Sequence, residues 1–199
     1  MEIAIRLIAL AIAIIIHEMA HGFAAHLLGD PTAKNAGRLS FNPLVHIDPF
    51  GSVLLPIMLV LTHSPVLLGW AKPVPFNPAY FKDPKRGIMY VGAAGPVSNL
   101  ILALGASTIL RIIPIGGVIG LFLVQFCVIN VILAVFNLIP IPPLDGSRVL
   151  MGILPDDLAK KYMQLERFGF IIIFGLLYLG VLDAIMIPIA RGLLSFLLG

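Results

Sequence analysis

Long apolar stretches, separated by short polar segments, run through most of the chain. Three of them are long enough to cross the hydrocarbon core of a bilayer as helices, which takes about 20 residues; they are residues 3–28, 88–113 and 118–138. Residues 168–182 are a shorter fourth candidate, and residues 184–198, which Pro188 and Arg191 interrupt, either cross the membrane or lie at its interface. The pattern predicts an all-α polytopic membrane protein with about four to five transmembrane helices.

Residues 50–70 form an apolar segment of another kind, because prolines and polar side chains interrupt it. Pro56 and Pro65 disfavour a continuous helix, and residues 62–64 are polar. The segment either spans the membrane or enters and leaves on the same side as a re-entrant hairpin. Two pieces that flank it, residues 36–42 and 70–76, alternate in polarity or carry prolines, and we expect both to form short edge β-strands.

Composition supports a membrane protein. The chain has 199 residues, of which 59% are hydrophobic and 12% charged, and its mean hydropathy is +1.05. A soluble domain is about half apolar and a quarter charged. The length predicts a single domain over residues 1–199. A net charge of +3 does not indicate a nucleic-acid partner, and a single cysteine, Cys127, excludes an internal disulfide and a cysteine-rich zinc site.

The first apolar helix contains three ionisable side chains in the pattern H-E-x-x-H, which are His17, Glu18 and His21. Residues four apart share one face of a helix, so the two imidazoles can bind one Zn²⁺ while Glu18 acts as a general base. Ionisable residues at bilayer depth are costly and therefore tend to be functional. The alternative, two buried histidines bonded to neighbouring helices, leaves Glu18 without a role.

A catalytic zinc usually takes three protein ligands, so a third ligand must come from another segment. Residues 136–150 are the best source, because three prolines end the preceding helix and Asp145 follows on irregular backbone. An isolated Asp-Gly is also typical of a surface turn. In the same chain as H-E-x-x-H, it predicts that His17, His21 and Asp145 bind one zinc ion per chain.

The motifs together resemble the site-two proteases, the intramembrane zinc metalloproteases of peptidase family M50. The resemblance covers most of the chain and rests on H-E-x-x-H, on Asn137 with Leu144-Asp145-Gly146, and on residues 95–99, which match the family's G-P-x-x-N. The stretches GRLSFNPLVHIDPFG and GWAKPVP are similar to the compact prokaryotic branch. No segment corresponds to the PDZ or CBS domains of longer members.

The resemblance implies a zinc-dependent endopeptidase that hydrolyses peptide bonds of membrane-spanning proteins, with a zinc-activated water as nucleophile and Glu18 as general base. It also implies that Asn99 holds the substrate or the developing oxyanion, although an interhelical hydrogen bond is an alternative. The expected partners are single-pass transmembrane substrates and the lipid bilayer; the oligomeric state is not indicated. The alternative function is that of a metal carrier with the same metal ligands. A carrier would not need Glu18.

His46 is a separate candidate, since a histidine in the polar stretch after the first helix could contact a ligand or the transition state.

The remaining prediction concerns the membrane topology. His17 lies toward the end of the first helix and Asp145 follows the third long helix, so these two ends must lie on one side of the membrane. They do so only if residues 50–70 are re-entrant. Basic residues then gather on the face that the positive-inside rule makes cytoplasmic, although a spanning segment gathers nearly as many. We expect a multi-pass cell-membrane protein whose active site opens toward the cytoplasm.

Overall fold

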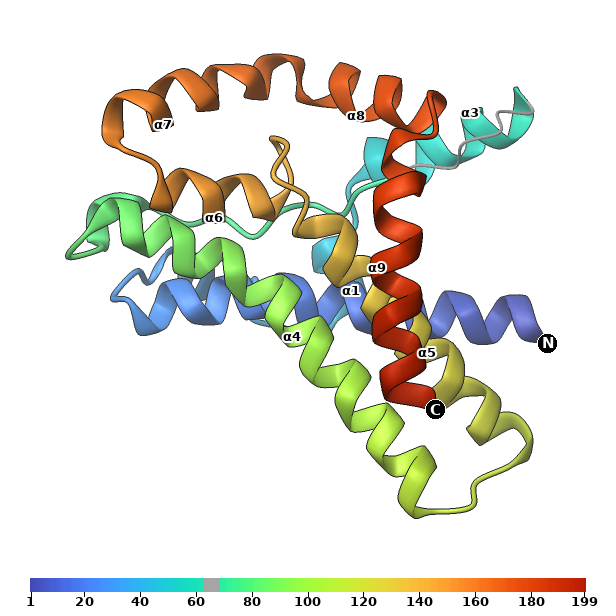
Figure 1. Cartoon of the computed structure of the whole chain (residues 1–199). Coiled ribbons are helices and arrows are strands. Elements are labelled where there is room, and N and C mark those ends of the chain that lie inside the picture. The colour runs from blue at the N-terminus through green and yellow to red at the C-terminus, as the bar shows by residue number, and fades with distance from the viewer. Residues whose placement is uncertain (63–68) are drawn as a thin grey trace.

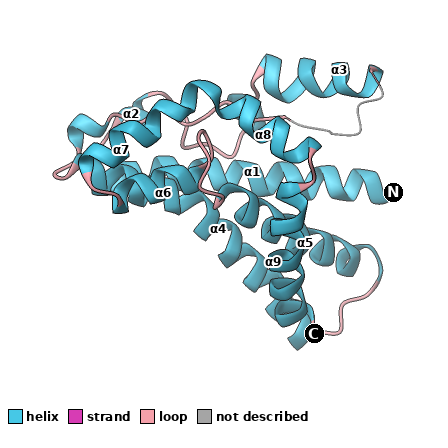
Figure 2. Cartoon of the chain, turned by 45° about the horizontal axis from the view of Figure 1, so that its top comes forward, coloured by secondary structure: helices cyan, strands magenta, loops and turns pink. Residues whose placement is uncertain are grey.

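A computed structural model describes residues 1–62 and 69–199, and four of its helices are long and apolar enough to cross a membrane (Figure 1). These are α1 (Glu2–Leu27), α4 (Pro84–Ile112), α5 (Gly117–Asn137) and α9 (Val181–Leu198). The expected all-α architecture with about four candidate membrane-spanning helices is confirmed. The part of the chain that the structure describes contains no β-strand (Figure 2).

Shorter elements fill the connections between these four helices. The α-helical ones are α2 (Thr32–Asn35), α3 (Leu55–Leu61), α6 (Asp145–Ile153), α7 (Asp156–Met163) and α8 (Gly169–Tyr178). The others are the 3₁₀ turns η1 (Pro43–His46), η3 (Pro78–Tyr80) and η4 (Gln164–Phe168) and the π-helical η2 (Pro49–Leu54). Most of these elements lie at one end of the bundle, where α6, α7 and α8 follow one another (Figure 1).

Helices α1, α4 and α5 pack on one another through small side chains. The most deeply buried members of this core are Ala9, Ala13, Ala103, Ala106, Cys127 and Val131. Small residues let helix backbones approach closely, which is the main source of helix association in a membrane. The close crossing of α1 and α4 matters for the site, because it brings residues from both helices within hydrogen-bond distance.

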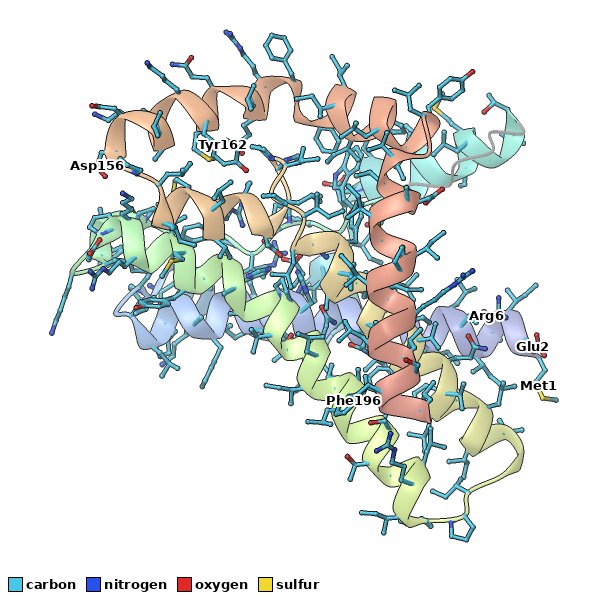
Figure 3. All side chains as sticks on the ribbon, viewed as in Figure 1. Met1, Glu2, Arg6, Asp156, Tyr162 and Phe196 are labelled. Carbon is cyan, nitrogen blue, oxygen red and sulfur yellow. The ribbon has the colours of Figure 1, made fainter. Side chains whose placement is uncertain are left out.

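Polar contacts tie the ends of the long helices to their neighbours. The Asp83 side chain caps α4 by accepting from the Arg86 N–H at 3.0 Å. Lys85 Nζ binds Asp156 Oδ1 at 2.7 Å, which joins the start of α4 to the start of α7, and Tyr162 of α7 donates its hydroxyl to Pro140 O at 2.8 Å (Figure 3). Helix α7 is thereby fixed over the proline-rich turn that follows α5.

The predicted strands at residues 36–42 and 70–76 are not present. Residues 70–76 have no regular secondary structure, and their hydrogen-bond partners are short helical turns and a side chain rather than a neighbouring strand. The N–H groups of Trp70 and Lys72 donate to Gly51 O of η2 and His46 O of η1. Pro73 and Pro75 have no N–H, so a regular ladder cannot form. Residues 36–42 contain a turn instead, with Gly37 at a φ of 65°.

The predicted fourth span at residues 168–182 is wrong, because Gly180 divides it. Gly180 adopts a φ of 70°, a left-handed conformation that ends α8 and lets α9 begin in a new direction (Figure 1). The ten residues of α8 are about 15 Å long, too short to cross a bilayer. The fourth candidate span is α9, the segment for which the sequence left two possibilities open.

The tip of the predicted hairpin, including His63, lies outside the described residues. The described ends of the segment meet: Trp70 N–H donates to Gly51 O at 3.1 Å, and Ser52 Oγ donates to Trp70 O at 2.8 Å. The rings of Phe50 and Trp70 also lie against each other, with centroids 5.8 Å apart. Between these ends, α3 projects away from the long helices (Figure 1).

Candidate metal centre

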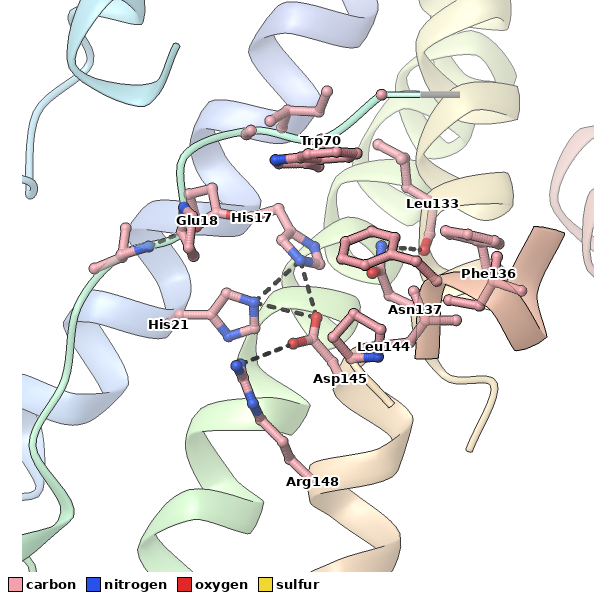
Figure 4. Close-up of a pocket in the computed structure, with 18 of the residues that line it drawn as sticks. His17, Glu18, His21, Trp70, Leu133, Phe136, Asn137, Leu144, Asp145 and Arg148 are labelled. Atoms are coloured by element: carbon pink, nitrogen blue, oxygen red, sulfur yellow. Dashed lines mark hydrogen bonds and ion pairs between the residues drawn. The ribbon is translucent and has the colours of Figure 1, made fainter. Parts of the chain in front are cut away.

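The two motif histidines and Asp145 converge inside the protein (Figure 4). His17 Nε2 and His21 Nε2 lie 3.0 and 3.2 Å from the same carboxylate oxygen, Asp145 Oδ2, and 3.0 Å from each other. All three side chains are buried. Donors at about 2.0–2.2 Å from a tetrahedral zinc lie about 3.3–3.6 Å apart, so the observed spacing is slightly shorter than that of three zinc ligands and close to it.

Local sequence explains how these residues meet. His17 and His21 are one turn apart on α1, and Asp145 is the first residue of α6, directly after the proline-rich turn. The next residue must be glycine, because a Cβ at Gly146 would lie 2.2 Å from Leu138 O. The Asp-Gly pair thus permits α6 to start against the backbone of the turn and to direct the carboxylate toward α1.

Hydrogen bonds to the outer nitrogens orient both imidazoles. His17 Nδ1 donates to Asn99 Oδ1 at 2.6 Å, and His21 Nδ1 donates to Val91 O at 2.7 Å. A carbonyl oxygen can only accept, so each Nδ1 carries the proton and each Nε2 presents its lone pair to the shared centre. Such outer contacts fix both the tautomer and the ring direction of metal-binding histidines.

A glycine on α4 leaves room where the three donors converge. A Cβ at Gly95 would lie 2.5 Å from His21 Nε2 and 2.6 Å from His17 Nε2. No side chain can be accommodated there without displacing the imidazoles. Two imidazoles, one carboxylate and an adjacent open space fit a zinc ion with three protein ligands and one exchangeable position.

The centre opens into a cavity of ≈440 Å³ between α1, residues 69–76, the end of α5 and α8. Its apolar wall consists of Ile14, Leu133, Phe136, Phe170 and Ile173 among others. Its polar lining includes Glu18, Asn137, Arg148 and Glu166. A mostly apolar cavity with a few polar groups beside a reactive centre is typical of a substrate site.

Glu18 lines this cavity next to the ligands but does not belong to the donor cluster (Figure 4). Its Oε2 accepts a hydrogen bond of 3.0 Å from the Val74 N–H. The carboxylate is therefore held between the metal centre and residues 69–76, a position from which it can accept a proton from a water in the cavity.

Comparisons with known proteins agree with this geometry. The sequence profile of peptidase family M50 matches residues 111–179. YwhC of Bacillus subtilis, provisionally named as a zinc metalloprotease, is 37% identical over 174 residues, which are 83% of this chain and 76% of YwhC. The chain belongs to peptidase family M50. The family assignment and the predicted class of enzyme, a metalloendopeptidase, are thereby confirmed.

More distant relatives of this M50 peptidase carry similar names. Rip2 of Mycolicibacterium smegmatis, also provisionally a zinc metalloprotease, is 27% identical over 164 residues, 81% of this chain and 62% of Rip2. The zinc metalloprotease MJ0392 of Methanocaldococcus jannaschii is 34% identical over 85 residues, 43% of this chain and 24% of that protein. No solved structure gives a significant match.

Asn99 does not line the cavity of this M50 peptidase. It is fully buried, and besides its bond to His17 its Nδ2 donates to Asn130 Oδ1 at 2.8 Å and to Ala13 O at 3.4 Å. The structure shows the interhelical hydrogen bond that was the alternative for Asn99, and the contact to substrate or oxyanion stays a prediction. The amide that does line the cavity is Asn137.

His46 is also placed away from the ligands. It is buried, its Nε2 donates to Ser40 O at 2.8 Å, and it does not line the cavity. Its backbone carbonyl accepts from the Lys72 N–H at 2.9 Å. His46 therefore supports residues 69–76, and its predicted contact to a ligand or to the transition state stays a prediction.

The sequence reasoning missed three residues around the centre. Asn130 is an isolated amide in the apolar stretch at 118–138, a signal that was available. Arg148 lines the cavity and contacts Asp145 Oδ1 at 3.4 Å, the oxygen that does not face the histidines. Trp70 lines the cavity and packs on Phe170, with ring centroids 4.9 Å apart.

Proposed function

We propose that this M50 peptidase is a zinc-dependent intramembrane endopeptidase that hydrolyses peptide bonds of membrane-spanning proteins. The observation that carries the proposal is the convergence of His17, His21 and Asp145 beside a cavity lined by Glu18, with two of these ligands in a helix apolar enough to span a bilayer. The zinc metalloprotease names of the relatives support zinc as the metal. The cluster of three donors found in the described part of the chain supports one ion per chain.

The mechanism follows from the positions of the side chains. Zinc, when bound, supplies Lewis acidity toward a substrate carbonyl and toward water. Glu18 accepts the proton of the attacking water and returns it to the leaving nitrogen. His17, His21 and Asp145 keep their donor atoms aligned through the contacts to Asn99, Val91 and Arg148. The apolar cavity wall excludes bulk water, which strengthens these electrostatic interactions.

The cavity limits the form in which a substrate is bound. An α-helix with its side chains is about 10–12 Å across, and ≈440 Å³ holds a few side chains at most. A transmembrane substrate therefore has to unwind locally and present an extended stretch to Glu18. The apolar lining favours apolar substrate side chains near the cleaved bond.

We infer a topology in which residues 50–70 form a re-entrant hairpin and the active site opens toward the cytoplasm. The meeting of Gly51 with Trp70 supports an entry and an exit on the same side. The positive-inside rule supports the orientation. The basic residues that it places in the cytoplasm are Lys34, Arg38, Lys72, Lys82, Lys85, Arg86, Arg148, Lys160, Lys161 and Arg167.

The test is cleavage that depends on Glu18. A panel of single-pass membrane proteins is co-expressed with the native chain or with Glu18→Gln, and zinc is measured on each purified variant. Glutamine has nearly the same shape but cannot act as the base, so fragments should fall by about 10²–10⁴-fold while zinc stays bound. Equal cleavage with zinc in place would contradict a role for Glu18 as the base, and zinc binding without cleavage of any substrate would favour a metal carrier.

A further inference from the structure

Three buried ionisable side chains outside the metal centre support one short segment, residues 69–77. Among the described residues, and apart from the thiol of Cys127, the buried charged or ionisable side chains are those of the three proposed metal ligands and of Asp30, Arg38 and His46. Burying such groups is unfavourable unless they are hydrogen-bonded. That all three contact the same short segment therefore needs an explanation. None of the three lines the active-site cavity.

These side chains hold the 69–77 segment at two points. Asp30 Oδ2 accepts from the Asn77 N–H at 2.6 Å. At the other point, Arg38 Nη2 donates to Lys72 O at 2.5 Å, and the His46 carbonyl accepts from the Lys72 N–H at 2.9 Å. The His46 ring holds that carbonyl in place through its own bond to Ser40 O.

Val74 lies between the two points of attachment. Pro73 and Pro75 flank it, so its N–H is the only backbone donor in residues 73–75. That N–H donates to Glu18 Oε2 at 3.0 Å. The Val74 side chain is itself buried against α1, where a Cβ at Gly22 would lie 2.8 Å from Val74 Cγ1.

We propose that the 69–77 segment positions the Glu18 carboxylate through the Val74 N–H, and that Asp30, Arg38 and His46 are positioning residues that act through this one donor. The proposal rests on the proposed function, in which Glu18 is the general base. A carboxylate with one oxygen held by a fixed donor keeps a defined direction toward water in the cavity, and misplacing a catalytic group by about 1 Å can cost about 10²-fold in rate.

The central test compares Val74→Pro with Val74→Ala. Proline removes the N–H and suits an extended segment, whereas alanine keeps the N–H and measures the loss of the side chain alone. A single-pass reporter that the native chain cuts is the substrate. At saturating reporter, Val74→Pro should be about 10²-fold slower than Val74→Ala, with equal KM and full zinc content. Equal rates for the two zinc-loaded variants would overturn the proposal.

Glu18→Gln in the same assay distinguishes a failure of the proposed function from a failure of the positioning role of the 69–77 segment. If Glu18→Gln retains full activity, the proposed function fails. If Glu18→Gln is inactive while Val74→Pro matches Val74→Ala, only the positioning role of the segment fails.

Hydrogen exchange tests the same contact without depending on activity or on the folding of Val74→Pro. Within residues 73–75 only Val74 has an exchangeable backbone amide, because its neighbours are prolines, so the difference between overlapping proteolytic fragments isolates its exchange. This amide should exchange slowly in the native chain and faster in Glu18→Ala and in Asp30→Ala. Unchanged exchange in Glu18→Ala would overturn the contact.

Combining two variants tests the role of Asp30. Asp30→Ala should lower kcat in the native background but not in Val74→Pro. Additive losses of kcat would show that Asp30 acts by another route.

Discussion

The imidazole of His17 donates from Nδ1 to the amide oxygen of Asn99, 2.6 Å away and 82 positions later in the chain. Asn99 in turn donates to Asn130, so one proposed metal ligand is linked through two amides to the core of α5. This network lies entirely within the apolar interior, where an unpaired polar group is costly. Through this network Asn99 orients the imidazole of His17, one of the proposed metal ligands.

The first prediction is that Asn99→Val weakens zinc binding. Without the amide oxygen, His17 is free to adopt the other tautomer, which turns its lone pair away from the centre. Loss of such an outer contact typically lowers metal affinity by about 10–100-fold. Competition with a chelator measures the affinity. Ser107→Ala, which removes a buried hydroxyl of α4 bonded only within that helix, is the matched control and should bind zinc as the native chain does.

The second prediction concerns the space beside the donors. Gly95→Ala should abolish stoichiometric zinc binding, because the new Cβ would lie 2.5–2.6 Å from both Nε2 atoms. Gly105→Ala is the control: it changes the same residue type in the same helix, at a position where no atom lies within 4 Å of the new Cβ. Full zinc content in folded Gly95→Ala would show that the metal does not occupy the space beside this glycine.

The third prediction tests the ligand set itself. Purified native protein should contain one zinc per chain, His17→Ala or His21→Ala should empty the site, and Asp145→Ala should weaken it. The histidines provide two of the three donors from one rigid helix, whereas Asp145 comes from a separate segment. Metal analysis of the purified variants is the measurement. Stoichiometric zinc in the double histidine variant would exclude this ligand assignment.

How far the sequence alone could go depended on how local each feature is. His17 and His21 could be placed together because a spacing of four on one helix puts them on one face. Asp145 could be added only because zinc chemistry requires a third donor. The partner of Asn99 could not be predicted, since it depends on how α1, α4 and α5 cross, and that crossing is determined by small side chains that carry no directional signal.

Hydropathy placed the boundary between α8 and α9 a few residues too late, between residues 182 and 184. Residues on both sides of Gly180 are apolar, and the left-handed conformation of this glycine divides them. The strand prediction at residues 70–76 failed because Pro73 and Pro75 prevent a ladder; the segment instead makes hydrogen bonds to η1, to η2 and to Glu18. An alternating pattern predicts an extended chain but not its partner.

The fourth prediction concerns the membrane topology. Residues 30–49 and 72–85 should face the same compartment. Only a re-entrant segment between them leaves the end of α1 and the end of α5 on one side of the membrane, where Asp145 can meet the two histidines. Cysteines introduced at Lys34 and Lys82, in a Cys127→Ala background, should react alike with a membrane-impermeant thiol reagent. Cys127 is fully buried among small side chains, so alanine should be tolerated there. Opposite labelling of the two sites would mean that residues 50–70 span the bilayer.

The last prediction concerns Asp30, which anchors the 69–77 segment after the end of α1. Burial by itself raises the pKa of this carboxyl, but hydrogen bonds from Thr32 and from the Asn77 N–H outweigh burial and hold the pKa below its usual range. A group whose pKa is lowered by folding contributes stability above its unfolded pKa, near 4, and loses it as the pH falls through the folded value.

The stability difference between the native chain and Asp30→Asn should therefore be largest above about pH 4 and shrink as the pH falls further. Thermal unfolding of detergent-solubilised protein from neutral pH to about pH 3 measures this difference, and Asp157→Asn, at an exposed position, controls for the loss of one negative charge. Asparagine can still accept one hydrogen bond, so the variant should fold and allow the comparison. A difference that stays constant over the whole range would show that the ionised form of Asp30 is not what holds the 69–77 segment to the end of α1.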